Sequence, residues 1–141
     1  MRGHTLVELT FVMTLAAVGA ASLAPAARRY RDSAAVAAAR ETTIGLLAEA
    51  RAAGVTSGAG VLAIATGPSR VWLVSTDSTL HAVALESEYG VDVELTGGRS
   101  STEIAYNALG LGSFANETLV FRRGDATATL VVSGYGRIRR R

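Results

Sequence analysis

The sequence predicts an α+β fold, in which one long N-terminal hydrophobic helix packs on an antiparallel β-sheet domain. Two observations predict this class. Residues 6–27 form an apolar run with a single charge, and residues 28–53 continue in Ala-rich sequence without proline. From residue 55 onward, short runs rich in Val, Leu and Thr alternate with glycine-containing turns, which is typical of antiparallel strands.

The composition excludes several kinds of protein. A chain of 141 residues is about one domain. The absence of cysteine excludes disulfides, thiolate metal sites and cysteine nucleophiles. Two histidines, His4 and His81, are too few for a histidine-based metal site, so we expect no metal and no cofactor.

The net charge of +2 conceals an uneven distribution. Residues 54–134 carry four arginines against eight acidic residues, whereas residues 135–141 carry four arginines and no acid. A mildly acidic body therefore ends in a concentrated basic tip, which bears on the choice of partner.

The first apolar run predicts a membrane-spanning helix. Residues 9–27 are 19 residues without a charge, and a helix of that length spans about 28 Å, close to the thickness of a bilayer core. A secretory signal peptide cleaved near Ala24-Pro25-Ala26 is the alternative interpretation. The length of the run and the acidic Glu8 inside it argue against that alternative. A carboxylate in a membrane segment costs at least about 2.5 kcal/mol, so Glu8 needs a cationic partner.

The residues around Glu8 are more specific. Arg-Gly-His-Thr-Leu-Val-Glu-Leu at residues 2–9 resembles the leader and first helical turn of type IV prepilins and type II secretion pseudopilins. The resemblance implies that a prepilin peptidase cleaves between Gly3 and His4 and removes a leader of residues 1–3. Glu8 is then the fifth residue of the mature chain, where the family's Glu pairs with the amino terminus of a neighbouring subunit. His4 stands where the family usually has Phe.

The same resemblance implies a location. Residues 4–27 become the transmembrane and filament-core helix of a single-pass inner-membrane protein, with Pro25 where many pilins have a helix-kinking proline. The C-terminal domain then lies in the periplasm or outside the cell. The positive-inside rule, applied to Arg28, Arg29 and Arg31, would invert this topology. We give precedence to the prepilin motif, because the short leader of a prepilin stays in the cytoplasm.

Residues 28–54 predict an amphipathic continuation of the helix. Val36, Ile44, Leu47 and Ala50 recur at helical spacing between charged residues, and Gly54 is a good helix stop. The apolar face of this helix needs a cover, and the β-rich segment at residues 55–134 provides it.

We expect strands at residues 60–66, 70–76, 80–86, 91–95, 103–107, 117–123 and 127–133. The strongest pattern is a hairpin around Arg123-Gly124-Asp125. The residues at 103–107, Gly110, and the segments 118–121 and 130–137 resemble the C-terminal part of H-type minor pseudopilins and FimT-type minor pilins. The strand order in residues 55–100 is left open.

The basic tail at residues 135–141 is the second candidate site. Gly136-Arg137-Ile138-Arg139 resembles the Gly-Arg-x-Arg tail with which FimT-type minor pilins bind DNA at a pilus tip. On a mobile tail, the guanidinium groups of Arg137, Arg139, Arg140 and Arg141 bridge phosphates and release counterions. The alternatives are a solvated tail and a contact with anionic lipid or with an acidic neighbouring subunit. H-type pseudopilins also end in Gly-Arg.

Several motifs that could carry chemistry are better explained structurally. The glycine pattern at residues 58–63 follows a helix and precedes a strand, the reverse of the order that a dinucleotide site needs. Asp77, Ser78 and His81 are close in sequence and lack a nucleophile elbow, so His81 is interpreted as a surface residue. Trp72 is interpreted as a core residue.

Four acidic residues close in sequence could suggest a cation site. They are Glu86, Glu88, Asp92 and Glu94, and their alternation fits the outward faces of strands better. We expect no metal site, no catalytic residues and no enzymatic activity.

These observations leave three functional hypotheses. The leading one is a minor pilin-like subunit of the type II secretion pseudopilus, with a structural role in its assembly or priming. The alternative is a FimT-type minor pilin at the tip of a type IV pilus, which binds DNA for uptake through its arginine tail. The third is a membrane-tethered binding domain without a filament role. The expected partners are the prepilin peptidase, other pilins through the N-terminal helix, the inner membrane and, in the second hypothesis, DNA.

Overall fold

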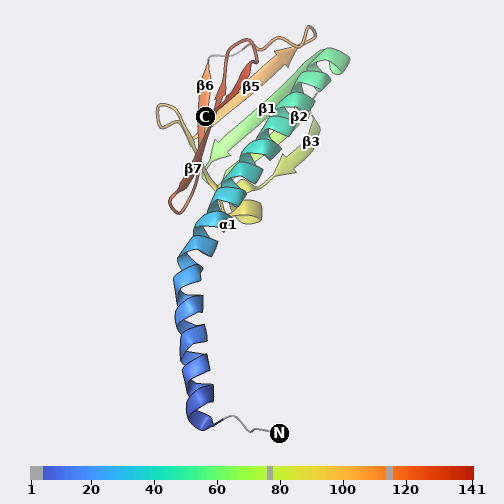
Figure 1. Ribbon diagram of the computed structural model, residues 1–141. Coiled ribbons are helices and arrows are strands. Elements are labelled where there is room, and N and C mark those ends of the chain that lie inside the picture. Colours follow the sequence, from blue (N-terminus) through green and yellow to red (C-terminus); the bar gives the residue numbers. More distant parts are fainter. Residues whose placement is uncertain (1–4, 76–77, 114–115) are drawn as a thin grey trace. The chain divides into compact units, whose positions relative to one another are not determined.

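The computed structural model describes residues 5–75, 78–113 and 116–141 (Figure 1). The chain divides after Arg31 into two compact units, which are described separately. Its elements are α1 (Leu6–Ser57), β1 (Ala59–Thr66), β2 (Ser69–Ser75), β3 (Ser78–Val83), α2 (Leu85–Tyr89), β4 (Asp92–Leu95), β5 (Ser101–Asn107), β6 (Glu117–Arg123), β7 (Ala126–Val132) and β8 (Ile138–Arg140).

The first unit contains the N-terminal half of α1. The helix begins at Leu6, where Thr5 and Glu8 have the spacing of a capping box, and the Glu8 amide donates to the Thr5 hydroxyl at 3.4 Å. Pro25 lies inside α1 and does not end it. The helix continues to Ser57, three residues beyond the expected stop at Gly54.

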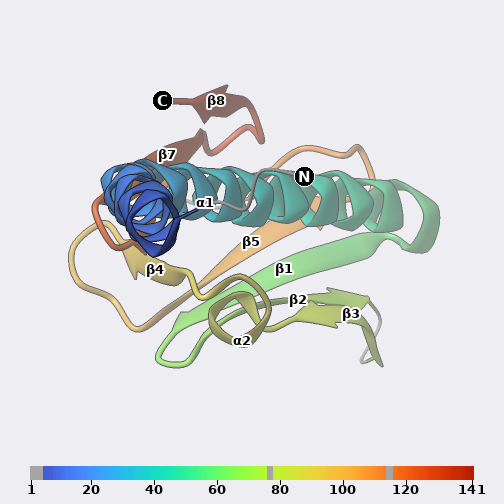
Figure 2. The same ribbon diagram turned by 60° about the horizontal axis from the view of Figure 1, so that its bottom comes forward.

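In the second unit, the C-terminal half of α1 is amphipathic. One face is buried against the sheets at positions three or four residues apart, as a helix of 3.6 residues per turn requires. The predicted inner face is confirmed at Val36, Leu47 and Ala50, and Ile44 is partly buried beside the core. Figure 2 shows β1 and β5 running beside this half of the helix.

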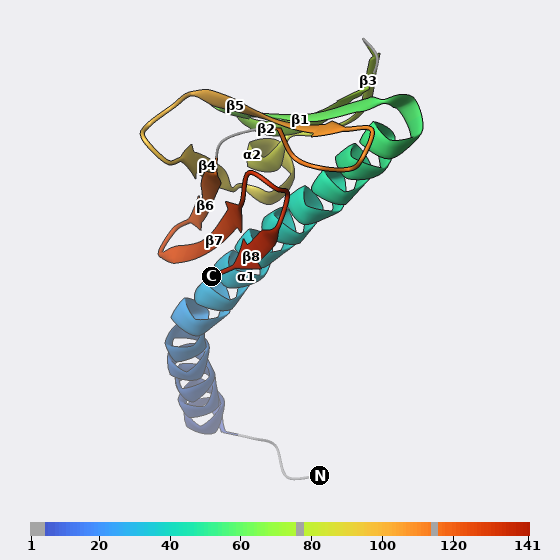
Figure 3. The same ribbon diagram turned by 90° about the horizontal axis from the view of Figure 1, so that it is seen from above.

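In the described part of the chain, the strands form two four-stranded antiparallel sheets (Figure 3). Sheet A has the order β3-β2-β1-β5, and sheet B has the order β4-β6-β7-β8. The predicted hairpin is β6–β7, in which Arg123 pairs with Ala126 across a turn at Gly124 and Asp125. The fold is α+β, as the sequence predicts.

Two local expectations about the middle of the chain are wrong. The segment expected to be a strand at residues 80–86 ends at Val83 and is followed by the short helix α2, which carries Glu86 and Glu88. Of the four acidic residues expected on the outward faces of strands, only Asp92 and Glu94 lie there. Trp72 is not a core residue: Val71 and Leu73 on β2 point inward, so Trp72 lies on the outer face, where the Arg70 guanidinium lies 4.9 Å from its ring centroid.

Candidate functional sites

The N-terminal half of α1 is an apolar helix without a cover of its own. Every described residue from Thr5 to Arg31 is exposed. This helix is long and apolar enough to cross a membrane, and its most apolar stretch is not buried by the rest of the described chain. The hydroxyls of Thr10, Thr14 and Ser22 donate to main-chain carbonyls one helical turn earlier, at 2.7–2.9 Å. Their polar groups are therefore satisfied inside the helix, which suits an apolar environment.

Of the predicted processing and assembly residues, Glu8 lies in the described part of the chain. It lies in the first turn of α1, where a carboxylate interacts favourably with the helix dipole. Gly3 and His4 lie outside the described residues.

At the other end of the chain, the segment expected to be a mobile basic tail contains a strand. β8 pairs antiparallel with β7, with Ile138 opposite Val132 and Arg139 opposite Val131. The pairing extends to Arg141, which exchanges two main-chain hydrogen bonds with Thr129 at 2.9 and 3.0 Å. The arginines are therefore fixed in register on the edge of sheet B, not carried on a free tail.

The strand alternation separates the four arginines. Arg137, Arg139 and Arg141 share the outer face of β8 with Val131, because side chains two residues apart point the same way. Arg140 points to the other face, where its guanidinium donates to both carboxylate oxygens of Glu41 on α1 at 2.9 and 3.0 Å. Among the described residues, no acidic side chain forms an ion pair with Arg137, Arg139 or Arg141.

The Glu41–Arg140 contact holds β8 against α1. The hydrogen bond from Arg140 is the main cause that lowers the pKa of Glu41, and the charges of Arg140 and Arg40 act in the same direction. A lowered pKa in the folded state means that the contact stabilises the fold above the ordinary carboxyl pKa of about 4.3. That contribution is lost as the pH falls through the lowered value.

Glu41→Gln is expected to loosen β8 without unfolding the domain. At pH 6 the main-chain amide of Arg141 should exchange with deuterium about two to five times faster than in the parent chain, because exposed ion pairs contribute little. At a pH below the lowered pKa of Glu41 the two chains should exchange at the same rate. Glu103→Gln, a change of an exposed acid on β5, is the matched control and should have no effect. A difference that persists at low pH would show that the ion pair is not its cause.

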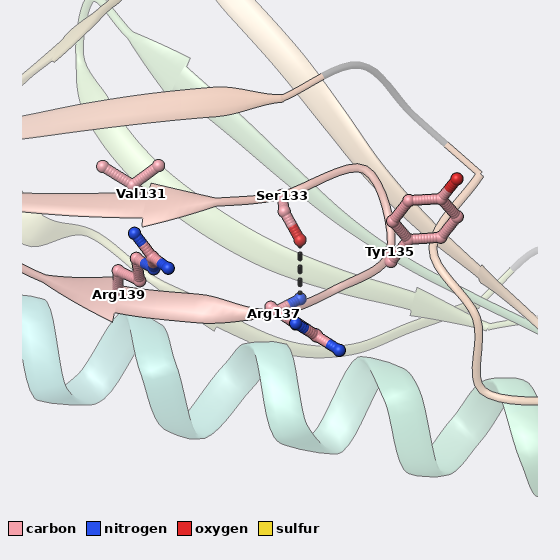
Figure 4. A pocket seen from close by; sticks show the side chains of 5 residues that line it. All are labelled: Val131, Ser133, Tyr135, Arg137 and Arg139. Carbon is pink, nitrogen blue, oxygen red and sulfur yellow. Dashed lines mark hydrogen bonds between the residues drawn. The ribbon is translucent and has the colours of Figure 1, made fainter.

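Two hollows adjoin β8. One, of about 400 Å³, is lined by Val131, Ser133, Tyr135, Arg137 and Arg139 (Figure 4). The Ser133 hydroxyl accepts a hydrogen bond from the Arg137 amide at 3.1 Å, which fixes the turn before β8. The second hollow, of about 780 Å³, shares Tyr135, Arg137 and Arg139 with the first. Its other lining residues are Arg51 of α1, Leu111, Gly136 and Ile138.

Sequence reasoning missed Arg51 and Tyr135 as members of this site. Arg51 is 86 residues from Arg137, and only the packing of α1 beside β8 brings them to one hollow. The alternation Arg137-Ile138-Arg139 was the signal that could have revealed the strand.

Gly136 explains the position of the turn that carries Tyr135 and Arg137. Its φ is +79°, and a Cβ atom there would lie 2.7 Å from the ring of Tyr106 on β5. A larger residue at this position would therefore be strained and would push the turn away. Burial raises the pKa of Tyr106, while the positive charge of Arg51 acts to lower it. The phenol of Tyr106 is therefore neutral at physiological pH.

The other motifs do not form a site in the described part of the chain. The glycine pattern at residues 58–63 begins directly after α1 and runs into β1, the order expected from the sequence. The exposed His81 lies 3.5 Å from the Glu49 carboxylate on α1, and Asp77 lies outside the described residues. No group of three or more potential metal ligands occurs among the described residues.

A long apolar N-terminal helix whose C-terminal half packs on antiparallel sheets is the fold of type IV pilins. No family model matches the chain, and no curated protein matches it. Among solved structures, the chain is similar to the crystal structure of the type IV minor pilin FimU of Pseudomonas aeruginosa strain PAO1. The TM-score is 0.57 at 15% sequence identity, and the similarity covers 75% of this chain and 87% of the FimU chain. This likeness concerns the fold.

Proposed function

We propose that this chain is a minor pilin-like subunit that α1 holds in the inner membrane until it enters a filament. A prepilin peptidase would cleave between Gly3 and His4, and Glu8 would then pair with the amino terminus of a neighbouring subunit. The filament proposed first is the type II secretion pseudopilus, in whose assembly or priming the chain would have a structural role.

One observation carries this proposal: the two halves of α1 differ in what covers them. The second half buries Val36, Leu46 and Leu47 in the domain core, whereas the described residues of the first half are exposed although most of them are apolar. An apolar helix needs a cover of lipid or protein. Lipid supplies it before assembly, and the helices of neighbouring subunits supply it afterwards.

A second candidate function is DNA binding for uptake through a type IV pilus. It is favoured by the three arginines that share the outer face of β8. Alternate residues on a strand are about 6.7 Å apart, and duplex DNA carries one charge per about 1.7 Å of its axis. All three guanidinium groups can therefore meet phosphates at once. Duplex binding that weakens with salt would favour this candidate over a secretion pseudopilus.

The filament proposal is tested by Glu8→Ala. The variant should insert into the membrane as the parent chain does, because the change makes the apolar run more apolar. It should be reduced at least about tenfold in sheared filaments, since the cationic terminus of its neighbour loses its charged partner. Quantitative immunoblotting of membrane and filament fractions measures both.

A matched control and a test of processing accompany this variant. Glu49→Ala removes an exposed carboxylate from the other half of α1 and should enter filaments normally. Gly3→Ala should keep the full-length mass, because the leader is not removed. Normal filament entry of the Glu8→Ala chain would overturn the assembly role of Glu8. If the parent chain isolated from the membrane still carries Met1, the leader is not removed, and a membrane-tethered domain without a filament role is favoured instead.

A further inference from the structure

We propose that the larger hollow beside β8 binds an unpaired nucleotide, with its base on Tyr135 and its phosphates on Arg51, Arg137 and Arg139. This inference rests on the DNA-binding candidate and goes beyond it. It adds Arg51 of α1 and the ring of Tyr135 to the arginines of the tail, and it assigns a preference for single-stranded over duplex nucleic acid.

The charge of the hollow is the first argument. Of the described residues that line it, three are arginines, which stay protonated at every physiological pH, and none is acidic. Arg51 comes from α1 and the other two come from the segment around β8, so the cations face the hollow from two elements. A flexible phosphate backbone that enters the hollow would be held from both sides.

The aromatic ring is the second argument. Tyr135 is 78% exposed, although a tyrosine side chain at a turn could pack against the adjoining strand. It lines both hollows together with Arg137 and Arg139. Leu111 and Ile138 add apolar surface to the larger one. An exposed ring between cations is the arrangement on which proteins stack the bases of single strands.

The position of Tyr135 in the hollow favours single-stranded over duplex nucleic acid. A base within a duplex is already stacked on its neighbours and cannot reach Tyr135 without leaving the helix, which costs a few kcal/mol. A duplex would therefore contact the outward arginines of β8 alone. In a single strand the bases are free to turn, so one nucleotide can occupy the volume of about 780 Å³ that lies between α1 and β8.

The experiment measures the binding of two fluorescent probes to the full chain in non-ionic detergent across a salt series. The probes are an oligothymidine of about 16 nucleotides and a duplex of equal length. The parent chain should bind oligothymidine more tightly than duplex. Tyr135→Ser should weaken oligothymidine binding roughly 5- to 100-fold, whereas Tyr135→Phe should retain it because the ring remains. Arg51→Gln should weaken it and reduce the slope of log K against log salt by about 0.7.

Matched controls make the result specific. Arg70→Gln removes an exposed arginine on sheet A, outside the lining of either hollow, and should change neither affinity. Tyr135→Ser and Arg51→Gln should leave duplex binding within about twofold, whereas replacement of Arg137, Arg139, Arg140 and Arg141 by Ala should abolish it.

The two proposals fail in different ways. Duplex binding that depends on the tail arginines, with oligothymidine binding unaffected by Tyr135→Ser, would overturn the nucleotide subsite and keep the DNA-binding candidate. No binding of either probe at low salt would overturn both.

Discussion

Gly60→Ala is expected to destabilise the globular unit by at least about 3 kcal/mol. A Cβ atom on Gly60 would lie 2.0 Å from the main-chain oxygen of Ala50 and 2.8 Å from the main-chain nitrogen of Gly54. Both atoms belong to the backbone of α1, so no side-chain rotation can relieve the clash. β1 would have to move away from α1.

The measurement is thermal unfolding of the full chain in detergent, followed by near-ultraviolet circular dichroism. A loss of this size should lower the Tm by more than about 10 °C. Gly45→Ala is the matched control, because Gly45 lies in the same helix and a Cβ there meets nothing within 4 Å. That change should leave stability unaltered or raise it by up to about 1 kcal/mol. Equal Tm values for the two variants would show that the close approach of β1 to α1 does not limit stability.

Most elements of the fold could be predicted because each depends on residues close together in the sequence. The helical face of Val36, Leu47 and Ala50 depends on a period of 3.6 residues within one segment. The hairpin at Gly124 depends on a turn between two alternating strands, and the glycine adopts a φ of +55° there. Each of these elements could be predicted without knowledge of the rest of the chain.

The expectations that failed concern features set by distant parts of the chain. Trp72 lies outside because Val71 and Leu73 on its two sides are buried in the core, and successive side chains of a strand point to opposite faces of the sheet. α2 has five residues, too few for a helical period to appear in the sequence. β8 exists because β7 offers it an edge and Glu41 holds Arg140. The candidate site shares this dependence, since Arg51 joins the hollow through packing alone.

Arg99→Ala is expected to have the second large effect on stability. Glu117 begins β6 with its side chain only 2% exposed, and the Arg99 guanidinium donates to one of its carboxylate oxygens. The other oxygen, Oε2, has no hydrogen-bond partner among the described residues. Removal of Arg99 would leave a buried carboxylate without its cation, which costs about 3 kcal/mol. The same thermal unfolding measurement on the full chain would register this loss.

A second change in the same chain separates this cause from a general effect of losing an arginine. Arg99→Ala with Glu117→Leu should recover most of the lost stability, because an apolar side chain of similar size needs no cation. Arg122→Ala is the control: Arg122 and Glu94 also form an ion pair, at 2.9 Å, but both side chains are at least 50% exposed. Its loss should cost less than about 1 kcal/mol. If Arg99→Ala cost no more than Arg122→Ala, or if Glu117→Leu failed to restore stability, the burial of Glu117 would not be the source of the effect. The contrast between the two pairs follows from burial, since an exposed carboxylate that loses its arginine is solvated by water and the buried Glu117 is not.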